Sequence, residues 1–187
     1  MKGNWRRLLT AVLAVAVAGT LAVAGSSTAS ATRAACGITW GSGDKNAGGL
    51  ERGPLTNVRS GQQDCYDRLV LDFAAPGAHG YSVRYVPEVV EDGSGRPVPL
   101  RGGAKLQITA YAPAYDDAGH STYNPPNRAE LVNVTGYQTF RQVAWAGSFE
   151  GYTTIGLGVR ARLPFRVSTL DGPGTASRIV IDVAHTW

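Results

Sequence analysis

The sequence predicts an all-β fold, specifically an antiparallel β-sandwich of about nine short strands, with a partly open barrel as the alternative. Two observations support this prediction. Apolar and polar residues alternate in segment after segment with a period of two, as in strands that bury one face. Clusters of Gly, Pro, Asn and Asp separate these segments at intervals of about 8–12 residues. After residue 31 the sequence contains no credible helix.

Residues 1–31 are expected to form an export signal peptide. A positively charged start (1–7) precedes an apolar run (8–25), and the small-residue pattern Ala29-x-Ala31 follows, as at a signal peptidase site. The alternative is an uncleaved membrane anchor, because the apolar run is long enough for one. The sequence therefore predicts a secreted or wall-associated protein that does not insert in the membrane once the signal is cleaved.

The mature chain is close to neutral. The full sequence has 18 basic and 14 acidic residues, and three basic residues (Lys2, Arg6 and Arg7) lie in the signal peptide. Subtracting them leaves 15 basic against 14 acidic residues, a net charge of +1. This balance gives no electrostatic reason to expect DNA, RNA or an anionic membrane as a partner.

Cys36 and Cys65 are the two cysteines of the sequence. An even number in an exported protein predicts a disulfide, which would close a loop of about 30 residues and contribute about 3–4 kcal/mol in the chain-entropy model. A catalytic thiol is the alternative, but no His lies in a supporting local motif. A lipid anchor on Cys36 is disfavoured because Arg33 stands where a lipoprotein signal has an apolar residue.

The order of the elements follows from the alternation. Residues 32–63 are rich in Gly and polar residues and are expected to form an irregular lead held by the disulfide, so the domain spans residues 64–187. The segment 66–73 has the clearest strand pattern, with Leu69 and Leu71 on one face. A turn at 92–95 is followed by a short extended stretch. Further strands are expected at 80–86, 104–111, 131–135, 137–146, 153–159, 164–170 and 178–183.

Two segments resemble each other at every position, namely 68–73 (RLVLDF) and 178–183 (RIVIDV). If they pair antiparallel, Arg68 faces Asp182 and Arg178 faces Asp72. Each such cross-strand pair would contribute about 0.2–1 kcal/mol. Alternatively, the two segments occupy equivalent places in two different sheets. The sequence leaves both arrangements open.

These two segments carry a resemblance to a known family, together with Phe149-Glu150-Gly151, Gly156-Leu157-Gly158 and Pro164-Phe165-Arg166-Val167. They resemble the AMIN-like domain family of actinobacterial secreted proteins and lipoproteins over about residues 64–185. That family is similar to AMIN domains, which are β-sandwiches that help to position cell-wall amidases by contacting peptidoglycan. The resemblance implies a sandwich fold and an envelope-binding role, and it supplies no catalytic motif.

The sequence contains no recognised catalytic motif. His79, His120 and His185 belong to no close ligand pair, so neither a metal nor a cofactor is expected. No G-x-S-x-G elbow occurs. Gly156 and Gly158 lie within a strand pattern and are expected to mark a bulge or bend. We therefore expect no enzymatic activity.

The loop 112–128 is the leading candidate site, because long loops on a rigid scaffold commonly bind ligands. Its aromatic rings suit sugar rings, and its carboxylates suit hydroxyl or amine groups. The alternative is a solvated surface loop. Glu150 is a second candidate, although a glycosidase would need it to converge with another carboxylate. The candidate residues are Tyr111, Tyr115, Asp116, Asp117, His120, Tyr123 and Glu150. Trp40 and Trp145 are expected to be packing residues.

The expected function is non-catalytic binding of a cell-envelope component, with peptidoglycan or another wall glycan as the leading partner. A second hypothesis is an interaction module for another envelope protein, reached by strand addition at a sheet edge. A small secreted hydrolase is the third and least supported.

Overall fold

The computed structural model describes residues 36–49, 53–77 and 80–187. The expected signal peptide at 1–31 lies outside these residues. In the described part of the chain the regular elements are all β-strands, as predicted. This part also contains no helix with the length and apolarity that a membrane crossing requires.

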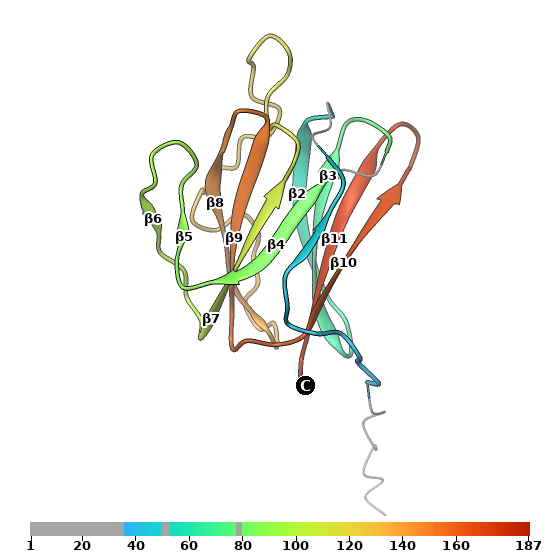
Figure 1. Ribbon diagram of the computed structural model, residues 1–187, viewed down its shortest axis with the longest axis vertical. Coiled ribbons are helices and arrows are strands. Elements are labelled where there is room, and N and C mark those ends of the chain that lie inside the picture. Colours follow the sequence, from blue (N-terminus) through green and yellow to red (C-terminus); the bar gives the residue numbers. More distant parts are fainter. Residues whose placement is uncertain (1–35, 50–52, 78–79) are drawn as a thin grey trace, which may run out of the picture. The chain divides into compact units, whose positions relative to one another are not determined.

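Two antiparallel sheets and a short hairpin make up the domain (Figure 1). The five-stranded sheet has the order β1 (Lys45–Ala47), β4 (Tyr81–Val86), β7 (Ala104–Ala110), β9 (Tyr152–Val159), β8 (Phe140–Phe149). The four-stranded sheet has the order β10 (Phe165–Asp171), β11 (Ser177–Ala184), β3 (Tyr66–Phe73), β2 (Leu55–Gln62). The hairpin pairs β5 (Val89–Val90) with β6 (Pro97–Val98).

The core lies between the two sheets, because their strands, other than the short β1, turn apolar positions inward. Leu69 and Leu71 of β3 meet Ile108 of β7 and Leu157 of β9 in one buried cluster. Each is fully buried, and burying such a side chain stabilises the fold by about 1.5–3 kcal/mol before entropy is counted. The period-two alternation therefore predicted correctly which face of β3 is buried.

The pairing of β3 with β11 settles the question left open by the two similar segments. They pair antiparallel in one sheet, with Arg68 opposite Asp182 and Arg178 opposite Asp72. Nε of Arg68 lies 2.7 Å from a carboxylate oxygen of Asp182. The second ion pair differs from the expectation, because Asp72 binds Arg59 at 2.8 Å instead. Nε of Arg178 is buried without a hydrogen-bond partner among the described residues.

The expectation of an irregular lead over 32–63 is wrong for part of that range. β1 pairs with β4, and β2 pairs with β3 and buries Leu55 and Val58. A bulge between Leu55 and Asn57 interrupts the period-two pattern of β2, which explains why the alternation was not recognisable.

The strand expected at 131–135 is also absent. Asn133 accepts a hydrogen bond from the backbone N–H of Thr135 at 2.9 Å, and Gly136 follows with φ of 82°. A side chain that bonds to the backbone two residues ahead favours a turn over a strand. The next strand, β8, therefore begins only at Phe140.

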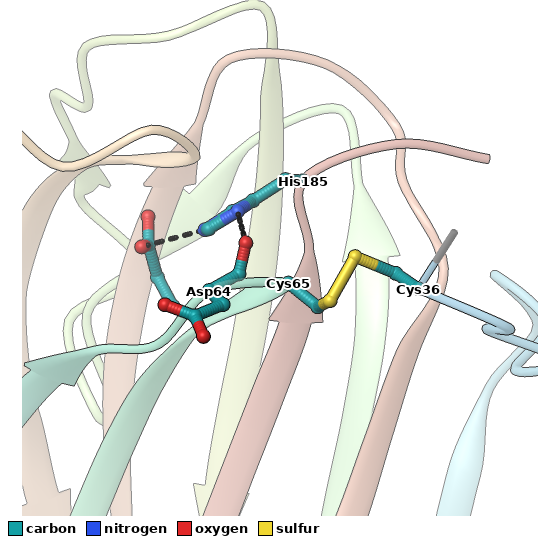
Figure 2. The surroundings of a disulfide bond; sticks show 5 residues. Cys36, Asp64, Cys65 and His185 are labelled. Atoms are coloured by element: carbon teal, nitrogen blue, oxygen red, sulfur yellow. Dashed lines mark hydrogen bonds and ion pairs between the residues drawn. A yellow bond between two sulfur atoms is a disulfide. The ribbon is translucent and has the colours of Figure 1, made fainter. Parts of the chain in front are cut away.

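The predicted disulfide between Cys36 and Cys65 is present, with a Cα–Cα distance of 5.6 Å. It joins the lead to the turn between β2 and β3. Beside it, Nδ1 of His185 lies 3.2 Å from the carbonyl oxygen of Asp64 (Figure 2). The other ring nitrogen of His185 lies 3.0 Å from the buried carboxylate of Asp67. The disulfide and the buried His–Asp pair thus fasten the same end of the sandwich.

Gly156 and Gly158 have a different role from the expected bulge or bend. β9 pairs with β7 without any register shift, and the extra residues of the two bulges in this region belong to β8. A Cβ at Gly156 would lie 2.8 Å from Leu100, and one at Gly158 would collide with the carbonyl oxygen of Arg101. The glycines let the chain after β6 lie directly on the outer face of β9.

Candidate functional site

The leading candidate loop folds back on itself as a small irregular hairpin. Tyr115 forms a β-bridge with Ser121, and the backbone N–H of Asp116 donates to the carbonyl of His120 at 2.9 Å. The turn between them is closed by the N–H of Gly119, which donates to the carbonyl of Asp116 at 2.9 Å. The loop therefore has a defined conformation that orients its side chains.

Asp116 and His120 are used within this turn. One carboxylate oxygen of Asp116 accepts hydrogen bonds from the backbone N–H groups of Ala118 at 3.0 Å and His120 at 2.8 Å. The other oxygen lies 3.3 Å from Nδ1 of His120. Asp117 is exposed at the tip. Asp116 and His120 therefore shape the loop, and none of the three candidates lines a hollow with the other candidates.

A hollow of about 340 Å³ opens beside the loop and brings two of the predicted residues, Tyr115 and Tyr123, together. Its remaining walls come from the rest of the loop and from β8. The hollow is lined by Ala114, Tyr115, Gly119, Ser121, Tyr123, Asn124, Pro125, Arg128, Trp145 and Ser148. We call this surface the loop hollow.

Two aromatic rings in contact lie at the loop hollow. The rings of Tyr123 and Trp145 have centroids 5.6 Å apart and planes inclined by 46°. Trp145 is only 9% exposed and belongs to the core cluster, so the expectation that it packs is correct, but it also lines the loop hollow. Burial raises the pKa of Tyr123, so its hydroxyl keeps its proton and remains a donor at neutral pH.

The walls of the loop hollow are tied to the sandwich by hydrogen bonds. The N–H of Trp145 donates to the carbonyl of Arg128 at 2.7 Å, so the chain at Arg128 runs along the edge of β8. Ser148 accepts from the N–H of Ala114 at 2.9 Å. The hydroxyl of Tyr115 accepts from the N–H of Gly151 at 2.9 Å. A ligand therefore meets a surface that is largely preorganised, which lowers the entropic cost of binding.

Glu150 and Tyr111 lie elsewhere, at the end of the β8–β9 hairpin. Glu150 has φ of 50° and, with Gly151 at 84°, forms the two-residue turn. A positive φ is unusual for glutamate, because Asn or Asp normally precedes Gly in such turns. The flanking pair Phe149 and Tyr152 is 51% and 40% exposed, and Tyr152 makes an edge contact with Tyr111 at 5.4 Å. These residues form an aromatic row outside the loop hollow.

The chemistry of the loop hollow suits reversible binding. The partly exposed rings of Tyr115 and Tyr123 offer apolar surface to sugar rings, and the exposed Asn124 and Arg128 offer hydrogen-bond donors to hydroxyl or carboxylate groups. None of its lining residues is acidic. Among the described residues, no three His, Cys, Asp or Glu side chains are grouped as a metal site.

Sequence reasoning missed four polar lining residues, Ser121, Asn124, Arg128 and Ser148. The first three lie inside the predicted loop, but their residue types are common at surfaces. Ser148 lies in β8, and its proximity to the loop depends on the tertiary fold.

Comparison with known proteins identifies a family. The family model of the AMIN-like domain matches residues 53–185. The match begins before β2, so it includes the strand that the resemblance over 64–185 left out. No curated protein and no solved structure matches the sequence.

Proposed function

Because this chain belongs to the AMIN-like domain family, we propose that it is a non-catalytic domain that binds a wall glycan, with peptidoglycan as the leading ligand. AMIN-like domains are typically extracellular or associated with the cell wall, and the family points to a binding role at the wall. In this proposal the loop hollow is the contact surface and the complex forms reversibly without covalent chemistry.

The observation that supports the proposal best is the contact between the tilted rings of Tyr123 and Trp145, beside the exposed Asn124 and Arg128. Carbohydrate ligands combine apolar ring faces with a rim of hydroxyl groups, and a site for them needs both kinds of contact. Asn124 and Arg128 supply the polar contacts. Tyr115 adds a third ring whose orientation is held by Gly151.

The test compares variants of the loop hollow with a control in the same loop. Deletion of 112–128 is unsuitable, because Pro113 and Thr122 both hydrogen-bond to the backbone of Leu55 in β2. We would instead measure retention of the mature protein on purified cell walls for Asn124→Ala, Arg128→Ala and the control Asp117→Ala.

Each lining variant is expected to weaken binding about tenfold, since about 1.4 kcal/mol of lost contact energy corresponds to that factor. The control should bind like the unaltered protein, because Asp117 is exposed and does not line the loop hollow. Absence of retention by the folded, unaltered protein would refute wall binding. Equal retention by all variants would refute the assignment to the loop hollow.

A second candidate function is docking of another envelope protein, and one observation supports it. β10 is an edge strand of the four-stranded sheet, and its Leu170 is 46% exposed. Edge strands present unpaired backbone groups to which an extended segment can add. Crosslinking from a Leu170→Cys variant should recover a partner under this alternative, and the same variant should leave retention on bare walls unchanged.

A further inference from the structure

A second hollow, of about 470 Å³, lies where β4 ends and β7 begins. We call it the basic hollow. It is lined by Tyr85, Val86, Pro87, Gly102, Gly103, Ala104, Lys105 and Arg162. The charged members of this lining are both cations, Lys105 and Arg162. It shares no lining residue with the loop hollow.

Arg162 is held in a fixed orientation. Its Nε donates to the hydroxyl of Ser42 at 3.2 Å, and its Nη2 donates to the carbonyl of the same residue at 3.0 Å. Its guanidinium carbon lies 4.9 Å from the centre of the Tyr85 ring. A guanidinium that stacks on a ring still directs its N–H groups outward in its own plane. Nη1 makes no hydrogen bond to the described residues.

Tyr85 is itself fixed beneath this guanidinium. Its hydroxyl donates to the carbonyl of Leu163 at 2.8 Å and accepts from the N–H of the same residue at 2.9 Å. The ring also makes an edge contact with Phe165 in the core, with centroids 5.7 Å apart. The stacking partner of Arg162 therefore belongs to the rigid part of the domain.

Lys105 supplies a second, more adaptable cation. Its Nζ donates to the carbonyl of Pro87 at 3.2 Å, which occupies one of three N–H groups. The ammonium group is therefore anchored at the rim and retains two donors for a ligand. Fixed guanidinium and mobile ammonium groups together are a common arrangement for phosphoryl recognition.

Further cations lie around the segment that holds Arg162. Nζ of Lys45 lies 4.1 Å from the ring centre of Phe165, and the guanidinium carbon of Arg166 lies 4.3 Å from the ring centre of Trp40. Arg166 also shares the buried carboxylate of Asp182 with Arg68. One carboxylate thus serves two arginines, which leaves one positive charge in that group uncompensated.

The acidic groups near these cations reduce the field but do not line the basic hollow. Asp44 is exposed and interacts electrostatically with Lys45. Glu88 is exposed and follows Pro87 in the chain. Although the mature chain as a whole is nearly neutral, the charged side chains that line the basic hollow are therefore both positive.

We propose that the basic hollow is an anion site that takes the phosphoryl groups of a phosphate-bearing polymer, with Arg162 as the fixed fork and Lys105 as the mobile cation. A phosphoryl group offers several acceptor oxygens, which match the free N–H groups of Arg162 and the two free donors of Lys105. The proposal stands apart from the glycan proposal, because the two hollows have no residue in common.

The test measures binding of the mature protein to immobilised long-chain inorganic polyphosphate over a range of salt concentrations. Lys105→Gln and Arg162→Gln are each expected to weaken binding about fivefold to tenfold and to lower the slope of log K against log salt by about one. Arg96→Gln removes the same charge from a residue of the β5–β6 hairpin that does not line the basic hollow, so it should leave binding unchanged.

Two further measurements keep the result unambiguous. The first is the melting temperature of each variant, because Arg162 also hydrogen-bonds to Ser42 and its replacement can affect the fold. If Arg162→Gln lowers the melting temperature, Lys105→Gln is the deciding variant. Asn124→Ala, which alters the loop hollow, should leave polyphosphate binding intact.

The proposal is overturned if the unaltered protein does not bind polyphosphate at low salt, or if Lys105→Gln binds as tightly as the unaltered protein. It is also overturned if Arg96→Gln weakens binding as much as Lys105→Gln, because net charge alone would then explain the effect. A third result would refute a polymer as the ligand: the unaltered protein binds phosphatidylglycerol vesicles more tightly than polyphosphate, and Lys105→Gln loses this binding to vesicles. The phosphoryl group would then belong to a lipid.

Discussion

Asp67 is the buried carboxylate on which one end of the sandwich depends. It is 0% exposed and lies in β3. One of its oxygens accepts from the backbone N–H groups of Thr139 at 2.6 Å and Phe140 at 2.9 Å. The other lies 3.0 Å from Nε2 of His185. It therefore joins β3 to the start of β8 and to the residue after β11.

Replacing Asp67 by alanine leaves two backbone N–H groups and one imidazole nitrogen without partners in a buried site. Each such loss costs about 1–3 kcal/mol, and the three are not additive because they share one carboxylate. Breaking a buried charged contact typically costs about 3–5 kcal/mol, which we take as the expected loss for Asp67→Ala. That is a large share of the total stability of about 5–15 kcal/mol of a typical domain.

Asparagine at position 67 should be much less harmful. Its amide oxygen can accept from the N–H groups of Thr139 and Phe140, and its NH₂ can donate to Nε2 of His185. The imidazole then keeps its proton on Nδ1, which faces the carbonyl of Asp64. We therefore expect Asp67→Asn to lose less than half as much stability as Asp67→Ala.

Urea denaturation at neutral pH, followed by tryptophan fluorescence, measures these differences in the free energy of unfolding. The control is Asp117→Ala, an exposed site where a change within about 0.5 kcal/mol is expected. A loss below about 1 kcal/mol for Asp67→Ala would refute the argument, since it is the least that one unpaired buried group costs. If asparagine were as harmful as alanine, charge and not hydrogen bonding would hold this end together.

Three other predictions concern stability. Reducing or mutating Cys36–Cys65 should cost about 3–4 kcal/mol, from the separation of 29 residues, and calorimetry with and without reductant measures this. Burial raises the pKa of Asp92, whose Oδ2 is buried without a partner among the described residues, so stability falls as pH rises through that pKa. At neutral pH, Asp92→Asn should therefore have a higher melting temperature than the unaltered protein. At a pH low enough to protonate the carboxyl group, the two proteins should melt at the same temperature. Equal melting temperatures at neutral pH would contradict this prediction. Gly158→Ala should cost about 1–3 kcal/mol, because its Cβ would collide with the carbonyl of Arg101, and a chemical denaturation midpoint equal to that of the unaltered protein would count against this close approach.

The failures of sequence reasoning have identifiable causes. β2 was missed because its bulge at Thr56 shifts the phase of the alternation and its outward residues are polar. The apolar residues within 131–134 resemble the pattern of a strand. The side chain of Asn133, however, accepts a hydrogen bond from the backbone N–H of Thr135, and this bond closes a turn there. In both cases a local irregularity outweighed the hydrophobic period.

The candidate site was predicted in part. The loop 112–128 does border a hollow, and Tyr115 and Tyr123 line it. Asp116 and His120 were chosen for their chemistry, yet both carboxylate oxygens of Asp116 and Nδ1 of His120 make contacts within the turn. Residue type indicates what a side chain could bind, whereas only the folded loop decides whether its polar atoms are free.

The amino-acid sequence alone determined the fold class, the buried face of β3 and the presence of a disulfide, because alternation is a local property of the chain and cysteine number is a property of its composition. The tertiary structure decided which charges meet. Asp182 serves Arg68 and Arg166 from two flanking strands, and Arg162 lies against Ser42, which is 120 residues away in the chain. Such encounters depend on how the sheets are ordered and registered, and short-range patterns carry no information about that order.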